Sequence, residues 1–172
     1  MSDEAAEAAQ AAERWLNEGP PVVGILCGSA SDLPVMQQAT AILERFQIPY
    51  EIQVLSAHRN PDQVDAYART ADERGLACVI CGAGMANHLA GAVAARTAIP
   101  VIGVPLSGSK LSGADALYST VQMPKGVPVA TVAIDGAVNA AILAAQILAV
   151  RDGEVKRRVW EFKDSLAEGF RP

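Results

Sequence analysis

The chain has only two histidines, and one of them stands where chemistry is commonly done. His58 follows an apolar run, Tyr50–Leu55, and has a hydroxyl, Ser56, and a guanidinium, Arg59, close by in the sequence. An asparagine and a proline come next and suit the start of a helix, so these residues are predicted to join a strand to a helix. Ligands of open α/β sheets bind beyond the carboxyl ends of strands. An imidazole there could exchange a proton near neutral pH, and Arg59 could bind a phosphate or carboxylate.

A second candidate is the turn Gly28–Asp32, which directly precedes a predicted helix. Free N–H groups and the positive end of the helix dipole would suit an anion, and Ser29 and Ser31 add hydroxyls. Asp32 is either an N-cap or an acceptor of hydrogen bonds from a sugar. The turn has neither G-x-G-x-x-G nor a P-loop lysine, so by itself it does not identify a ligand.

A third candidate is the glycine-rich segment Gly82–His88. Its glycines, Gly84 among them, fit either a close approach of backbone to ligand or tight helix–sheet packing. His88 is predicted to lie within the following helix, either as a structural hydrogen-bonding residue or in the wall of a pocket. The two histidines lack an H-x-x-x-H or carboxylate spacing, so we expect no bound metal.

The elements that must position these residues alternate between strand and helix. Continuous apolar strands between helices indicate a parallel sheet covered on both faces. We therefore expect an α/β fold, a three-layer αβα sandwich with a mainly parallel, flavodoxin- or Rossmann-like sheet and a C-terminal helical extension. Residues 1–20 are predicted to form an N-terminal helical appendage, and residues 21–172 a single catalytic domain. The predicted strands are Val22–Cys27, Tyr50–Leu55, Ala77–Cys81, Val101–Val104 and Val127–Ile134. The predicted helices are Pro34–Phe46, Pro61–Arg74, one from the glycine turn to about Thr97, Ala114–Val121, one from Asp135 or Gly136 to Val150, and Gly153–Leu166.

Composition limits the partners. With 51% apolar residues, 19% charged residues and a net charge of -5, the chain is not expected to wrap nucleic acid, and part of its surface is expected to contact other subunits. The segment Ala137–Val150 is apolar nearly all round, which predicts either a subunit contact or a central core helix. It is shorter than the roughly 20 residues of a membrane span, and no membrane or signal segment is expected.

Cys27, Cys78 and Cys81 are expected to be buried thiols, since residues three apart in a strand point to opposite faces. A cytoplasmic location fits.

Five motifs, in order and without large gaps between Val22 and Val150, resemble the class I PurE family of purine biosynthesis, which forms carboxyaminoimidazole ribonucleotide. They are Gly28–Asp32, Ser56–Arg59, Gly82–Gly84 with His88, Leu89 and Gly91, Gly103–Pro105, and Ser119–Pro124.

The resemblance implies an N5-carboxyaminoimidazole ribonucleotide mutase without cofactor or metal. It places Ser29 and Asp32 on the nucleotide, Ser31 close by, Arg59 at the phosphate and His58 at the proton. Further substrate-binding residues are then expected at Ser56, Ala57, Gly84, His88 and Leu89. The partners implied are a small ribonucleotide, a homo-octamer, and an ATP-dependent N5-carboxyaminoimidazole ribonucleotide synthase that hands the substrate on.

Two positions depart from the family pattern. Met85 stands where the family usually has glycine, and Ala90 where it usually has proline. If the backbone at position 85 needs a positive φ, methionine would be strained there.

Three other functions remain open from the sequence. Arg59 resembles the mutases, whereas the related carboxylases, which use free CO2, usually have lysine there. A flavodoxin-like module could hold FMN at the same strand ends, although Tyr118 is the one aromatic residue expected nearby. The third function is a nucleotide-sensing subunit without catalysis, and the presence of His58 weighs against it.

Overall fold

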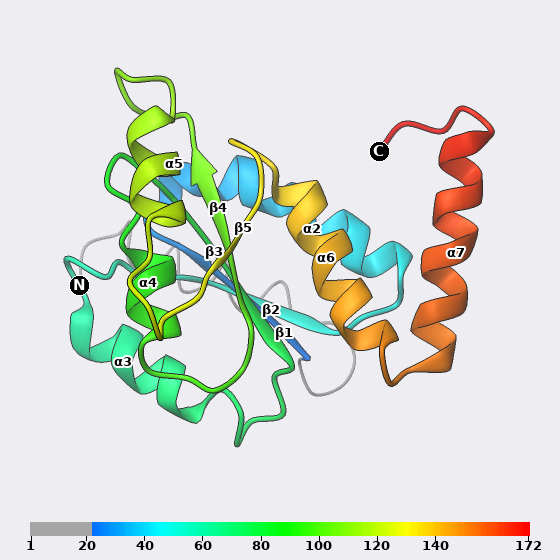
Figure 1. Ribbon diagram of the computed structural model, residues 1–172, viewed down its shortest axis with the longest axis horizontal. Coiled ribbons are helices and arrows are strands. Elements are labelled where there is room, and N and C mark those ends of the chain that lie inside the picture. Colours follow the sequence, from blue (N-terminus) through cyan, green and yellow to red (C-terminus); the bar gives the residue numbers. More distant parts are fainter. Residues whose placement is uncertain (1–21) are drawn as a thin grey trace.

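The computed structural model describes residues 22–172, so the appendage predicted for residues 1–20 lies outside the described residues. One five-stranded sheet runs through the centre of the molecule, and all of its pairings are parallel (Figure 1). The strand order is β2-β1-β3-β4-β5. The strands are β1 (Val23–Cys27), β2 (Tyr50–Val54), β3 (Cys78–Gly84), β4 (Val101–Leu106) and β5 (Ala130–Thr131).

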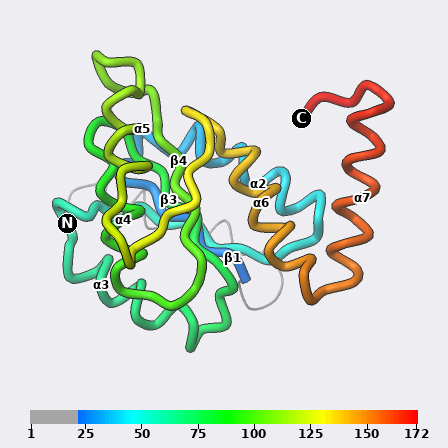
Figure 2. The backbone as a smooth tube through the Cα atoms, viewed as in Figure 1, coloured from blue at the N-terminus to red at the C-terminus, as the bar shows by residue number. Residues whose placement is uncertain are grey.

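Helices cover both faces of the sheet, as predicted. The helices α2 (Leu33–Arg45) and α6 (Ala137–Ala149) lie side by side on one face. On the other face are α3 (Pro61–Thr70), α4 (Leu89–Ala94) and α5 (Ala114–Val121). The last helix, α7 (Gly153–Ala167), packs against α6 on the side away from the sheet (Figure 2). The three-layer αβα sandwich with a C-terminal helical extension is therefore confirmed.

The strands are apolar because both of their faces are covered. Every residue of β1 is buried. Cys78 and Cys81 belong to hydrophobic clusters on opposite faces of the sheet, as the strand period requires. Burial raises the pKa of the Cys78 thiol to about 12, and it also raises the pKa values of Cys27 and Cys81. The prediction of three buried thiols is thus confirmed.

The third strand is longer than the sequence suggested. Gly82–Gly84, predicted to be a turn, continues β3 and pairs with Val104–Leu106 of β4. The glycine at position 82 leaves room for the buried thioether of Met36, which would have to move if a Cβ were present there. The strand therefore carries its backbone further toward the carboxyl edge of the sheet than its apolar run indicates.

Three other elements, the fifth strand and the helices α3 and α4, are shorter in the structure than the sequence predicted. The fifth strand has only two paired residues, and Pro128, which has no N–H to donate, stands just before it. Helix α3 ends at Thr70, and a turn closed by Gly75 (φ 88°) replaces its predicted last residues. Helix α4 ends at Ala94 instead of near Thr97.

The apolar helix α6 presents small side chains to the core. Its six buried residues are all alanines, which let the helix pack closely beside α2. Larger aliphatic side chains of α6 such as Ile142 and Leu143 are only partly buried. The predicted contact of this helix with another subunit stays a prediction. Within residues 22–172, no helix combines the length and the hydropathy needed to cross a bilayer.

The C-terminal helix is anchored by an aromatic contact that can be tested. Phe162 is 2% exposed, and its ring meets that of Phe46 edge-on with centroids 5.4 Å apart. We expect Phe162→Ala to lower the free energy of unfolding in urea by about 3 kcal/mol, since it leaves a cavity between α7 and the domain. Trp160→Ala, on the same helix but 60% exposed, should change it by less than about 0.5 kcal/mol. Equal losses in the two variants would contradict this packing.

Candidate functional site

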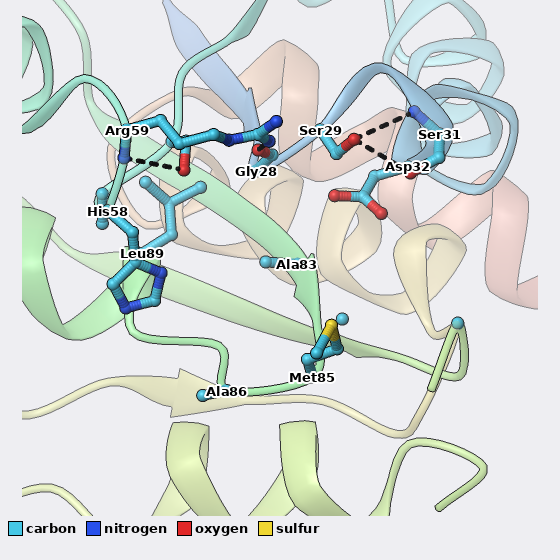
Figure 3. A pocket seen from close by; sticks show the side chains of 14 residues that line it. Gly28, Ser29, Ser31, Asp32, His58, Arg59, Ala83, Met85, Ala86 and Leu89 are labelled. Carbon is cyan, nitrogen blue, oxygen red and sulfur yellow. Dashed lines mark hydrogen bonds between the residues drawn. The ribbon is translucent and has the colours of Figure 1, made fainter. Parts of the chain in front are cut away.

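A cavity of about 610 Å³ lies at the carboxyl edge of the sheet. Since β1 lies between β2 and β3, the chain leaves β1 toward one side of the sheet and later crosses to the other, which opens a crevice at this switch point. The connections after β1, β2 and β3 supply most of its wall. Its lining residues are Gly28, Ser29, Ser31, Asp32, Ser56, Ala57, His58, Arg59, Ala83, Gly84, Met85, Ala86, Leu89 and Gly108 (Figure 3).

The turn after β1 is held by its own serines. The hydroxyl of Ser29 accepts hydrogen bonds from the Ser31 N–H (3.4 Å) and the Ser31 hydroxyl (3.0 Å). Asp32 occupies the N-cap position of α2, but its side chain makes no capping hydrogen bond. This result decides against the N-cap interpretation and leaves the Asp32 carboxylate available to the cavity. Gly28 is required because a Cβ there would come within 2.8 Å of the Ala83 Cβ.

The environment of Asp32 disfavours its charge. Burial raises the pKa of the carboxyl, while a hydrogen bond from the backbone at Ser29 and the positive charge of Arg59 oppose the rise. The net shift is upward. A half-buried carboxylate without a full set of partners is suited to accept hydrogen bonds from a ligand, which would offset the lost hydration.

The connection after β2 is organised around Ser56. Its hydroxyl accepts the Arg59 N–H (3.3 Å), and its own N–H donates to the Asn60 side-chain oxygen (3.4 Å). Asn60 takes the predicted N-cap position of α3, but its side chain makes no capping hydrogen bond there. The Arg59 guanidinium donates to the Gly28 carbonyl (2.7 Å), so the second motif reaches across to the first (Figure 3).

The two histidines meet, although 30 positions separate them. His58 Nε2 lies 2.8 Å from His88 Nδ1, and the rings are at 72° with centroids 5.0 Å apart. One of these nitrogens must carry the hydrogen and the other accept it, so the tautomers of the two rings depend on each other. His88 is not within the helix as predicted, because it is the N-cap residue of α4. It lies outside the cavity lining and contacts the ring of His58.

The turn after β3 is fixed from two directions. Asn87 is completely buried; its N–H donates to the Ser119 hydroxyl (2.8 Å) and its side-chain amide to the Val104 carbonyl (3.2 Å). Its side-chain oxygen has no partner within residues 22–172. These bonds tie the turn to both β4 and α5.

The cavity is divided by polarity. Ser29, Ser31, Asp32 and Arg59 lie along one side of it, and Ala83, Met85 and Ala86 along the other (Figure 3). One half can therefore hold a hydroxylated, anionic group, and the other half an apolar one. His58 and Leu89 lie next to each other in the cavity wall, between the polar side and the apolar side.

Comparison with known proteins fits this site. The model of the AIR carboxylase family matches residues 22–169. The chain belongs to this family. N5-carboxyaminoimidazole ribonucleotide mutase of Thermotoga maritima is 58% identical over 146 residues, with 85% of each chain covered. The mutase of Pyrococcus abyssi is 53% identical, covering 86% of this chain and 85% of that one. Phosphoribosylaminoimidazole carboxylase of Schizosaccharomyces pombe is 55% identical, but the match covers only 27% of that longer protein.

A solved structure agrees with the fold of this member of the AIR carboxylase family. PurE of Treponema denticola superposes with a TM-score of 0.77 at 32% identity, covering 86% of this chain and 92% of that one. The resemblance inferred from the five motifs is thereby confirmed.

The structure shows how the two residues that depart from the family pattern, Met85 and Ala90, are accommodated. Met85 has a φ of 56°, so the strain expected of a methionine there is present. Ala90 is completely buried, and its Cβ would lie 3.4 Å from a Cβ on Gly103, so alanine fills this position within the core.

The cavity brings together nine of the ten predicted site residues, all but His88. Five further lining residues were not predicted individually: Gly28, Ala83, Met85, Ala86 and Gly108. All but Gly108 lie in the two candidate segments Gly28–Asp32 and Gly82–His88. Gly28 and Gly108 had a signal, because each is a glycine soon after a predicted strand. Ala83 and Ala86 had no signal as individual residues, since a methyl group carries no chemistry, and only their place in the glycine-rich segment pointed to them.

The raised pKa of Asp32 gives a test by pH. At neutral pH the charged carboxylate costs folding free energy. This cost begins to fall as the pH drops through the raised folded-state pKa, and it has disappeared once the pH is below the unfolded-state pKa of about 3.9. We therefore expect Asp32→Asn to melt at a higher temperature than the wild type at pH 7, and the difference to close toward about pH 4. The exposed Asp72→Asn should shift the melting temperature by less than about 2 °C. A lower melting temperature for Asp32→Asn at pH 7 would contradict this description of the site.

Proposed function

We propose that this protein is an isomerase that converts N5-carboxyaminoimidazole ribonucleotide to 4-carboxy-5-aminoimidazole ribonucleotide. Mutases of that name are 53% to 58% identical to it over most of their length. One observation carries the proposal. His58, which can transfer a proton, lies in the cavity wall between a polar half and an apolar half.

The polar half suits the sugar phosphate. Asp32 accepts hydrogen bonds from ribose hydroxyls, and Ser29 and Ser31 add hydroxyl groups at the start of a helix. Arg59 neutralises the phosphate, and its hydrogen bond to the Gly28 carbonyl (2.7 Å) supports this placement beside the turn. Ser56, Ala57, Gly84 and Leu89 complete the substrate contacts.

The apolar half suits the imidazole ring and CO2. The bond between the exocyclic nitrogen and the carboxyl carbon breaks, its electron pair stays on nitrogen, and that nitrogen takes up a proton. The neighbouring ring carbon then attacks CO2, and its own proton is removed to restore the aromatic ring. One proton is taken up and one is released, so a single group that exchanges protons is sufficient.

His58 is this group. Its contact with His88 Nδ1 (2.8 Å) supports the assignment, because the partner ring fixes its orientation and tautomer. His88 is thus a positioning residue in the proposal. The wall of alanines and Leu89 excludes water from the reacting carbon, which limits escape and hydration of CO2.

Two other functions are less well supported. The carboxylase that uses free CO2 shares the fold and the site, and Arg59 is the feature that favours the mutase. An FMN-binding module would need aromatic side chains to stack on the flavin. Among residues 22–172, the cavity lining contains no Phe, Tyr or Trp, and Tyr118 lies outside it.

The family resemblance also supports proposals for the oligomeric state, the enzyme that supplies the substrate and the cellular location. A homo-octamer would cover the exposed apolar side chains of Leu111, Tyr118 and Val121. The substrate is a labile carbamate, so it must come from a preceding ATP-dependent N5-carboxyaminoimidazole ribonucleotide synthase. Free buried cysteines fit the reducing cytoplasm.

The substrate and the role of His58 can be tested together. We expect purified protein at low concentration to consume N5-carboxyaminoimidazole ribonucleotide, and to leave aminoimidazole ribonucleotide with bicarbonate largely unchanged. His58→Asn should lower turnover at least about 100-fold, since the proton-transfer group is lost, with nucleotide binding by calorimetry retained. Near-normal turnover in His58→Asn would remove this residue from the chemistry, and consumption of neither isomer by the wild type would refute the function.

The assembly has its own test. Sedimentation velocity at micromolar concentration is expected to show one closed oligomer, because a monomer would leave Leu111 and Tyr118 more than 60% exposed to water. A stable monomer under these conditions would be incompatible with the proposed octamer.

A further inference from the structure

Met85 has an unusual backbone for its residue type. Within residues 22–172 only four non-glycine residues have a positive φ, and Met85, at 56°, is the one of these that lines the cavity. A side chain with a Cβ is disfavoured in this region of φ, and glycine would adopt it freely. Such strain persists where the surrounding structure enforces it, and it is concentrated at functional sites.

The surrounding structure does enforce it. Two positions on, Asn87 is held by the Ser119 hydroxyl and the Val104 carbonyl, and on the other side Gly84 is paired with Leu106 in the sheet. The short stretch between them closes with a hydrogen bond from the His88 N–H to the Ala86 carbonyl (2.9 Å). With both ends fixed, Met85 cannot relax without breaking the turn that precedes His88.

The side chain of Met85 is exposed where an apolar cover would be needed. It is 67% exposed, and it projects from the apolar half of the cavity toward the side where Asp32 lies (Figure 3). A thioether chain has three rotatable bonds and adapts to different shapes. It also gains free energy when it leaves water to cover a bound apolar group, and it gains nothing when the cavity is empty.

We propose that Met85 determines the fidelity of carboxyl transfer by closing the apolar half of the cavity over CO2. The inference rests on the proposed function. After the nitrogen–carbon bond breaks, the cavity contains aminoimidazole ribonucleotide and CO2, which either recombine at the ring carbon or separate. The Met85 side chain blocks the exit of CO2, so that recombination occurs before separation.

The test is the ratio of aminoimidazole ribonucleotide released to carboxylated product formed from N5-carboxyaminoimidazole ribonucleotide. The rate of spontaneous carbamate loss without enzyme is subtracted. We expect Met85→Gly to raise this ratio at least about threefold, and to raise the melting temperature by about 2–4 °C because the strain is relieved. The conservative variant Met85→Leu retains an apolar cover and should restore a ratio close to that of the wild type.

Gln47 offers a matched control. It is also a non-glycine residue with positive φ (53°), but it lies in the α2–β2 connection, at the edge of the sheet opposite the cavity. Gln47→Gly should raise the melting temperature by a similar amount and leave the release ratio unchanged. A stabilised Met85→Gly with the wild-type ratio would overturn the role of Met85 while leaving the mutase intact. A wild type that does not consume the N5-carboxy isomer would overturn the proposed function and this inference with it.

Discussion

The site depends on the position of β1 between β2 and β3 in a parallel sheet. Parallel pairing places the carboxyl ends of these strands at one edge, and the change in winding direction keeps their connections apart there. The hydrogen bond from Arg59 to the Gly28 carbonyl then fixes the distance between the first two connections. The third connection is attached by the contact of His88 with His58. Three segments distant in sequence thus form one cavity.

The core and the site follow different physical rules. In the core, apolar strands, alanine-rich α6 and buried aromatic rings such as Phe162 all favour the same packing. At the carboxyl edge, local preferences are violated. Asp32 is partly desolvated without a capping bond, Met85 has a positive φ, and the side-chain oxygen of Asn87 has no partner within residues 22–172. Violations of this kind are expected where a structure is adapted to a ligand, since stability elsewhere offsets their cost.

Sequence reasoning succeeded where the signal is local. The bounds of α5 were predicted to the residue, and Pro61 marked the start of α3, because helix starts depend on nearby residues. It failed at Gly82–Gly84, whose strand conformation comes from pairing with β4, some twenty residues further on. For the same reason the His58–His88 contact could not be predicted. The motifs identified most of the cavity lining, but not how the Asp32 side chain is left uncapped or how Arg59 is held.

Division of the cavity into a polar half for the sugar phosphate and an apolar half for the reacting ring is the central claim. A crystal structure with bound 4-carboxy-5-aminoimidazole ribonucleotide tests it most directly. The predicted result has the ribose and phosphate on Ser29, Asp32 and Arg59, the base against Ala83 and Leu89, and the reacting ring carbon within reach of the His58 ring. A nucleotide bound in the opposite orientation, or at another place with His58 free, would contradict it.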